Sequence, residues 1–268
     1  MRYLIIIVLV ISFAFISCQK VIDVNLDETE KKYVIEGIIT DQSGQCEVII
    51  TETKDFNEDN NFSPISGASV SITDNSTGIT TSLSEEPGGT YKHATLAGVS
   101  GRTYTLHVSI NGNEYTASST VPQLVNMDTI YVSDDTWFDG KAIKMANIEY
   151  DDPAGVPNYY KFVRYLNGVK TKHIFNNNDD LTDGRHTTTT LFVDGNDNEE
   201  DKLESGDTVK IDMLCIDAAV YKYWYSMEQS ATGESQSAAP TNPVTNISGG
   251  ALGYFSAHTC QTKTMLVP

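Results

Sequence analysis

Residues 103–121, TYTLHVSINGNEYTASSTV, have the pattern of a two-stranded β-hairpin. Apolar or small residues alternate with polar ones along both arms, at Tyr104, Leu106, Val108 and Ile110 and then at Tyr115, Ala117, Ser119 and Val121. Because successive side chains of a strand point to opposite faces, each arm has one face suited to burial. Asn111-Gly112 between the arms is a preferred sequence of the type I′ turn. The stretch therefore predicts antiparallel β structure with one buried side.

The segment before the hairpin contains further short strands separated by turns. The expected strands are Tyr33–Thr40, Cys46–Ile50, Ala68–Ile72 and Ile79–Leu83, with turns at Asp41–Gly44 and Asn75–Gly78. Short strands at this spacing are typical of a β-sandwich. Pro122 follows the hairpin and cannot donate a hydrogen bond to a sheet. We therefore expect an Ig-like β-sandwich domain over residues 33–122.

Residues 123–268 have the pattern of a second antiparallel β domain with one helix. The expected strands are Ile130–Val132, Ile143–Tyr150, Tyr159–Leu166, Val169–Phe175, Thr187–Val193, Thr208–Ile216 and Leu252–Leu266. Asn167-Gly168 marks a second two-residue hairpin turn. We expect the helix at about residues 218–232, with Asp217 as its N-cap and Gly233 just past its end. The pattern fits a sandwich and a barrel-like sheet equally.

The N-terminal residues 1–17 have the pattern of a lipoprotein signal peptide. An apolar run follows Arg2 and is shorter than the about 20 residues that span a bilayer. It ends in Phe15-Ile16-Ser17-Cys18, which resembles a bacterial lipobox, although Phe15 stands where Leu is usual. This predicts cleavage before Cys18, acylation of Cys18 and a tether over residues 18–32. The alternative is an ordinary secreted protein in which Cys18 is free or in a disulfide.

The chain is strongly acidic, with 18 Lys and Arg residues against 36 Asp and Glu residues and a formal net charge of −18. Repulsion from phosphate therefore argues against nucleic acids and against polybasic adhesion to anionic lipids. Gln19-Lys20, followed by Asp23, Asp27, Glu28 and Glu30, is similar to the signal that sends lipoproteins to the outer face of the outer membrane. We expect a protein held on the outer membrane by its N-terminal lipid and exposed at the cell surface.

Two family resemblances extend over the chain. Gly37–Asp41, Ile65–Ile72, Gly89–Tyr91 and Thr103–Leu106 are similar to motifs of the carboxypeptidase-regulatory-like, transthyretin-like sandwich domain. Cys18–Asp23, Tyr33–Gly37, Asp128–Ile130, Ser205–Val209, Ala219–Glu228 and Asn242–Phe255 together resemble the Bacteroidetes lipoprotein family called domain of unknown function 4249. The second resemblance implies an accessory partner of a TonB-dependent outer-membrane receptor, and it implies no site residues.

Three cysteines follow Cys18, and a location outside the cytoplasm permits a disulfide. Cys215 and Cys260 are the expected pair because both fall in strands of the second domain, which leaves Cys46 buried and free. A pairing that uses Cys46 and three free buried thiols are the alternatives. No CxxC pair and no Cys/His spacing indicates zinc.

Aromatic residues are the expected ligand contacts, because aromatic faces stack on sugars and on peptide side chains. The candidates are Trp137, Phe138, Tyr159, Trp224 and Tyr254. On the expected helix, one stripe consists of Val220, Trp224, Met227 and Ala231. The other helix tyrosines, Tyr221, Tyr223 and Tyr225, either fill the rim around Trp224 or form a platform for a ligand.

Two acidic segments, residues 176–183 and 194–201, raise the question of calcium. The second has the first spacings of an EF-hand loop, but Glu199 and Ser205 stand where Gly and Glu are required. A looser calcium site built from both segments is one possibility, and solvated loops are the other. Thr129 and Thr208 lie in Asp-Thr-aliphatic triplets that are similar to an O-glycosylation motif of Bacteroidetes.

The five histidines are scattered, and the sequence has no HExxH, no GxSxG and no phosphate-binding loop. We therefore expect no catalytic residue, no cofactor and no enzyme. The leading expectation is a surface lipoprotein that helps a TonB-dependent transporter capture a peptide, a glycan or a metal chelate. The alternatives are a structural or adhesive surface lipoprotein without a small ligand, and a hydrolase whose site is assembled from distant residues.

Overall fold

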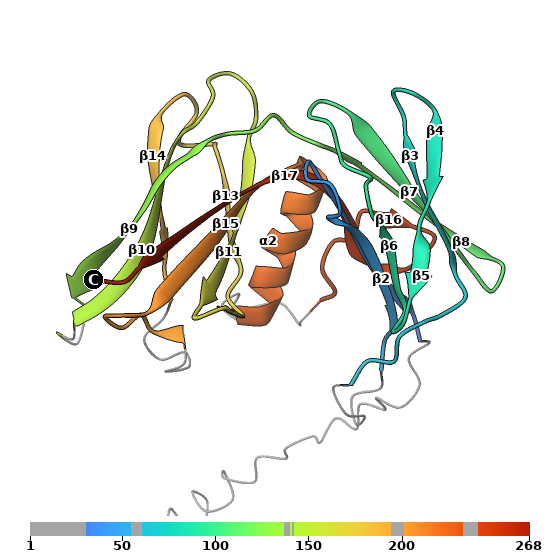
Figure 1. The fold of residues 1–268 in the computed structure, drawn as a ribbon, viewed down its shortest axis with the longest axis horizontal. Helices are drawn as coiled ribbons and strands as arrows, with labels where there is room; N and C mark the ends of the chain where they lie inside the picture. The colour runs from blue at the N-terminus through green and yellow to red at the C-terminus, as the bar shows by residue number, and fades with distance from the viewer. Residues whose placement is uncertain (1–30, 55–60, 137–139, 141, 194–200, 233–240) are drawn as a thin grey trace, which may run out of the picture. The chain divides into compact units, whose positions relative to one another are not determined.

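A computed structural model describes residues 31–54, 61–136, 140, 142–193, 201–232 and 241–268. Lys31–Thr53 and Asn61–Pro268 form one compact unit. Strands dominate this unit, and helix α2 (Ala218–Thr232) is packed among them (Figure 1). Over these described residues the protein is mainly β with one helix in the C-terminal half, as the sequence pattern predicts.

The strands of the first half follow the predicted pattern closely. They are β1 (Tyr33–Thr40), β2 (Cys46–Glu52), β3 (Ser69–Asp74), β4 (Ile79–Ser82), β5 (Ser84–Glu86), β6 (Thr90–His93), β7 (Thr103–Ile110) and β8 (Asn113–Thr120). The hairpin of β7 and β8 is confirmed, and Ile110 pairs with Asn113 across its turn. Asn111 and Gly112 both have positive φ angles, 50° and 82°, as a type I′ turn requires.

The second half adds strands on both sides of α2 in the sequence. They are β9 (Met127–Thr136), β10 (Ala142–Asp151), β11 (Tyr159–Leu166), β12 (Val169–Lys170), β13 (Phe175–Asn178), β14 (His186–Leu191), β15 (Thr208–Ile216), β16 (Ile247–Ser248) and β17 (Leu252–Leu266). The expected strand Val169–Phe175 is instead two short strands. Both β12 and β13 pair with β11, and residues 171–174 between them leave the ladder.

Three sheets arise from these strands in the described residues. A nine-stranded sheet has the order β12-β11-β15-β17-β1-β2-β6-β5, with β13 also paired to β11. A five-stranded sheet has the order β16-β8-β7-β3-β4, and a three-stranded sheet the order β14-β10-β9. The nine-stranded sheet contains strands of both halves because β17 pairs with β1 in parallel and with β15 antiparallel (Figure 1).

Two hydrophobic clusters lie on one face of the nine-stranded sheet. The first joins it to the five-stranded sheet, and it includes Phe255 and Ala257 of β17. The second joins it to the three-stranded sheet, and it includes Tyr160 and Met213. Because side chains alternate along β17, Tyr254 lies on the opposite face of the nine-stranded sheet. That opposite face is the one that carries α2.

Helix α2 begins where the sequence predicts. Asp217 caps it, since its Oδ1 accepts a 2.9 Å hydrogen bond from the backbone N–H of Val220. The other carboxylate oxygen accepts hydrogen bonds from Ser119 Oγ and from the backbone N–H of Thr120, both of β8. The cap therefore attaches the helix to the five-stranded sheet. In the described residues, no helix has the length and apolar character needed to cross a membrane.

Candidate functional site

Aromatic side chains from α2 and β17 meet on the outer face of the nine-stranded sheet. The ring of Tyr254 lies 5.0 Å from that of Trp224 and 4.8 Å from that of Tyr223, centroid to centroid. Tyr223 is buried, and burial together with the charge of Glu36 raises its pKa to about 12. These rings hold the helix against the sheet, and burial raises the pKa of Tyr254 above its ordinary value.

A buried lysine lies beneath this cluster. The ammonium Nζ of Lys161, from β11, is 2.9 Å from the centroid of the Trp224 ring. The side chain is 8% exposed, so the ring face replaces part of its lost hydration. Burial lowers the pKa of Lys161 well below its ordinary value, the charge of Lys170 lowers it further, and Glu36 opposes both.

His258 lies on the same face of β17 as Tyr254, further along the strand. Its Nδ1 is 2.9 Å from Ser256 Oγ, and the residue is 5% exposed. Burial lowers the pKa of His258 to about 4, and the nearby Lys161 contributes in the same direction. Burial therefore weakens both of these basic groups as proton acceptors compared with exposed ones.

Three tyrosines form a row at the outer edge of the cluster. Tyr159 of β11 lies 5.1 Å from Tyr221, and Tyr221 lies 5.9 Å from Tyr225, centroid to centroid. Tyr159 and Tyr221 are half-buried, whereas Tyr225 is 48% exposed. We call Tyr159, Tyr221 and Tyr225 the tyrosine row. Its rings are partly exposed, and aromatic rings with a polar hydroxyl group suit sugars and peptides.

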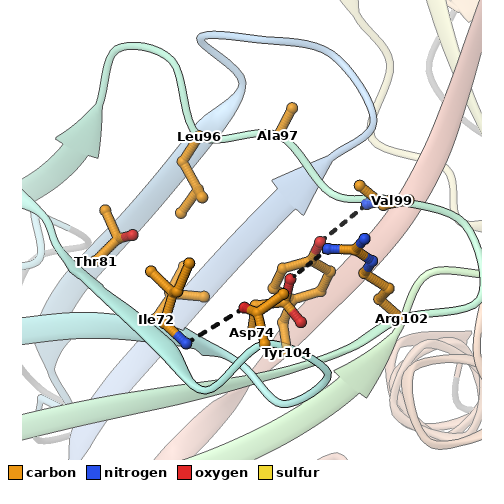
Figure 2. A pocket seen from close by; sticks show the side chains of 10 residues that line it. Ile72, Asp74, Thr81, Leu96, Ala97, Val99, Arg102 and Tyr104 are labelled. Atoms are coloured by element: carbon orange, nitrogen blue, oxygen red, sulfur yellow. Dashed lines mark hydrogen bonds and ion pairs between the residues drawn. The ribbon is translucent and has the colours of Figure 1, made fainter.

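A small pocket lies at the surface of the first half (Figure 2). Its volume is about 210 Å³, below the about 300–1,000 Å³ typical of drug-sized ligand sites. At its wall Arg102 Nη1 donates to Asp74 Oδ2 at 2.8 Å, and Tyr104 Oη accepts from the backbone N–H of Val99. Although burial raises the pKa of Asp74, the hydrogen bonds from Arg102 and Ser76 outweigh it and leave that pKa below its ordinary value. The ion pair and the hydrogen bond brace the wall internally.

The structure brings together three of the five predicted ligand contacts. Tyr159, Trp224 and Tyr254 all lie around α2, in the tyrosine row or the cluster behind it. Trp137 and Phe138 lie outside the described residues, as does the predicted lipidation site Cys18. Trp224 packs on the sheet, as expected if the apolar stripe of the helix serves only to bury it. Only some of the helix tyrosines therefore remain available as a platform for a ligand.

The expected disulfide between Cys215 and Cys260 is wrong, and the cysteines in the described residues are free. Strand register explains why. Cys215 pairs with Thr259 and Leu214 with Cys260, so the two cysteines occupy successive positions of one ladder. Their side chains therefore point to opposite faces of the sheet, which no disulfide geometry can join. Burial raises the pKa of Cys260 to about 11, so its thiol is unreactive at neutral pH.

The remaining sequence predictions concern the two acidic segments and the two candidate glycosylation sites. Residues 194–200 of the second acidic segment lie outside the described residues, whereas residues 176–183 are described. Thr208 is exposed and Thr129 half-buried, both in strands, and whether they carry glycans stays a prediction.

Sequence reasoning missed Lys161 as part of the aromatic cluster. The β11 sequence YYKFVRYL has large side chains at both odd and even positions, a pattern that indicates a strand covered on both faces. A lysine in such a strand is expected to be buried, so the sequence of β11 itself predicts the burial of Lys161. Its partner Trp224 lies far along the chain, and only the packing of α2 reveals that pairing.

One family model matches the chain over residues 19–264, and its description is "Domain of unknown function (DUF4249)". No curated protein matches the chain. The match covers nearly the whole sequence, including all three sheets and α2. The chain therefore belongs to the DUF4249 family.

Proposed function

We propose that this protein is a non-catalytic, outer-membrane-anchored surface lipoprotein that presents a ligand to a TonB-dependent receptor. The observation that carries the binding role is the tyrosine row, in which three partly exposed aromatic rings follow one another across α2 and β11. Such rings gain contact area with little loss of conformational entropy, because each has only two side-chain torsions.

The rigidity of the supporting structure favours this role. The row is seated on a helix that is capped by Asp217 and held by the Trp224–Tyr254 contact. Asn176 of β13 donates a 2.8 Å hydrogen bond to Glu228 beside the row. A binding surface on rigid elements needs little ordering when the ligand arrives, and glycans or peptides are the ligand classes that match it.

A second candidate function is a structural or adhesive role without a small ligand. The pocket in Figure 2 favours it, because its volume of about 210 Å³ is below the range typical of small-molecule sites. An adhesive surface would use the same exposed rings against a larger partner. The membrane anchor at Cys18 and the surface location belong to both candidates.

An affinity purification from solubilised outer membranes tests the proposal. The native lipidated protein carries an affinity tag at its C-terminus, and Cys18→Ala serves as the control for membrane placement. We expect a TonB-dependent receptor to co-purify with the native form and to be lost, or strongly reduced, with Cys18→Ala. Recovery of the lipoprotein alone from the cell surface would contradict the transport role and favour the adhesive one.

The tyrosine row has its own test in the same material. Tyr221→Ala with Tyr225→Ala should weaken binding to a glycan or peptide array at least tenfold, because two ring faces are lost. Tyr131→Ala is the matched control, since Tyr131 is 39% exposed on β9 and lies outside the row. Equal loss with Tyr131→Ala, or no loss with the double variant, would remove the row from the binding surface.

A further inference from the structure

Three aspartates of the second half lie close together, and none of them belongs to the tyrosine row or to the aromatic cluster behind it. Asp152 directly follows β10, Asp179 directly follows β13, and Asp183 lies in the turn before β14. One carboxylate oxygen from each lies within 4.8 Å of the others. Asp152 and Asp179 are 4% and 6% exposed, whereas Asp183 is exposed. Three acids from three separate segments thus share one small, partly enclosed volume.

Each carboxylate is held by hydrogen bonds from the protein. Asp152 accepts a hydrogen bond from the hydroxyl of Tyr160, and Asp179 Oδ2 accepts one from the backbone N–H of Asn158 at 2.8 Å. Asp183 Oδ1 accepts one from the backbone N–H of Gly155 at 2.6 Å. The second oxygen of Asp152, Oδ2, accepts a longer hydrogen bond of 3.4 Å from the backbone N–H of Gly184. The carboxylates are therefore oriented, and Asp179 and Asp183 each keep an oxygen for a further partner.

Asn158 adds an independent sign that something is missing from this volume. Its backbone and that of Asp179 extend the β11–β13 ladder by one pair beyond Tyr159 and Asn178. Residues opposite each other in a ladder project to the same face, and so does Tyr160, two positions along from Asn158. The Asn158 side chain therefore projects on the side where Tyr160 reaches Asp152. Its Oδ1 is buried and has no hydrogen-bond partner in the described part of the chain.

The electrostatics of the trio also call for a cation. Among the described residues, the ion pairs of lysine, arginine and histidine involve other carboxylates than these three. Like charges placed this close repel one another unless a proton or a cation lies between them.

We propose that Asp152, Asp179, Asp183 and the side-chain oxygen of Asn158 bind one Ca²⁺ ion. All four ligands are oxygens, which excludes the nitrogen and sulfur donors that zinc prefers. Calcium accepts six to eight oxygens in flexible geometry, and water completes the shell on the exposed Asp183 side. The ion links the end of β10 in the three-stranded sheet to β11 and β13 in the nine-stranded sheet. This site is independent of the tyrosine row and of the proposed transport role.

Terbium and calcium titrations test the site on the whole mature chain after treatment with EDTA. Tb³⁺ occupies calcium sites, and its emission is sensitised by a tyrosine nearby, here Tyr160. We expect saturable emission that Ca²⁺ displaces at lower concentration than Mg²⁺ does, and a rise in melting temperature on adding millimolar Ca²⁺. Asp179→Asn and Asp183→Asn should each weaken the Ca²⁺ affinity at least tenfold by calorimetry.

Asp180→Asn is the matched control, because it removes the same charge from the same segment. Asp180 is exposed and lies outside the trio, so its variant should bind Ca²⁺ within twofold of the unchanged protein. If Asp179→Asn does not fold by circular dichroism, Asp183→Asn decides, since that side chain is exposed. Absence of saturable Tb³⁺ and Ca²⁺ binding would overturn the proposal, and so would equal weakening by Asp180→Asn and Asp183→Asn.

Discussion

His258 shows how one residue can make stability depend on pH. In the folded protein its pKa is about 4 because the ring is buried, whereas an unfolded chain gives histidine about 6.5. Between these values the unfolded state binds a proton that the folded state does not. This contribution to stability is therefore complete above about pH 6.5 and decreases as the pH falls towards 4.

Urea unfolding at pH 7.5 and at pH 4.5 measures this effect. We expect the unchanged protein to lose about 2–3 kcal/mol through His258 between the two conditions. His258→Gln cannot titrate, so its loss over the same interval should be smaller by that amount. Because the comparison uses the difference between two pH values, a general destabilisation by the substitution does not affect it. Identical losses in both proteins would contradict the assignment.

Gly253 lies at a position where the surrounding backbone requires glycine. Its φ angle is +96°, and a Cβ atom there would collide with the backbone carbonyl of Ile35 on the neighbouring β1. Gly253→Ala should therefore cost about 3 kcal/mol or more, measured as a lower urea midpoint. Gly250→Ala is the control, since its φ is +91° but no atom lies within 4 Å of the added methyl group. Its loss of stability should be only the cost of backbone strain, about 1–3 kcal/mol.

At the scale of the element, α2 depends on one carboxylate for both its start and its attachment. Asp217 caps the helix and also accepts hydrogen bonds from Ser119 and Thr120. Asp217→Ala should destabilise the protein by about 2–3 kcal/mol, because the cap is lost and two partly buried donors lose their acceptor. Asp217→Asn keeps one acceptor oxygen and should cost less. Equal effects of the two variants on the melting temperature would contradict this expectation, because the acceptor oxygen that Asn retains would then contribute nothing.

The sequence predicts elements better than it predicts their partners. The hairpin at residues 103–121 and the helix at 218–232 rest on local signals, an Asn-Gly turn and an N-cap with a stripe of apolar residues, and both are confirmed. The division of Val169–Phe175 into β12 and β13 has no local signal, since it arises from how both strands pair with β11. Likewise Asp152 and Asn158 join the acidic segment 176–183 only through the register of distant strands.

At the scale of the whole molecule, β17 makes the two halves depend on each other. Its first part pairs with β1 and supplies Phe255 and Ala257 to the first hydrophobic cluster, while its later part pairs with β15. A fragment of residues 31–122 therefore lacks β17, the parallel partner of β1. It also lacks part of the first hydrophobic cluster. The boundary at residue 122 follows the sequence pattern, but the sheet and the first hydrophobic cluster include residues from both sides of it.

We expect the 31–122 fragment to show no cooperative thermal unfolding by circular dichroism, whereas the chain of residues 31–268 does. Adding a synthetic peptide of residues 241–262, which contains β16 and the first part of β17, should restore a cooperative transition. The same peptide with Phe255→Ala is the control, because that ring is fully buried in the first cluster. Cooperative unfolding of the fragment alone would show that its own strands suffice.

The parallel pair of β1 and β17 also has a consequence for the order of events during biogenesis. Synthesis makes β1 and its antiparallel partner β2 early and β17 last, so one edge of β1 has no partner until almost the whole chain exists. Until then β1 has an unpaired edge of the kind that invites aggregation. Contacts between such distant segments also make folding slow. A nascent chain of this protein is therefore a natural client for a holding chaperone, and a truncation near the C-terminus should be cleared by proteases rather than accumulate.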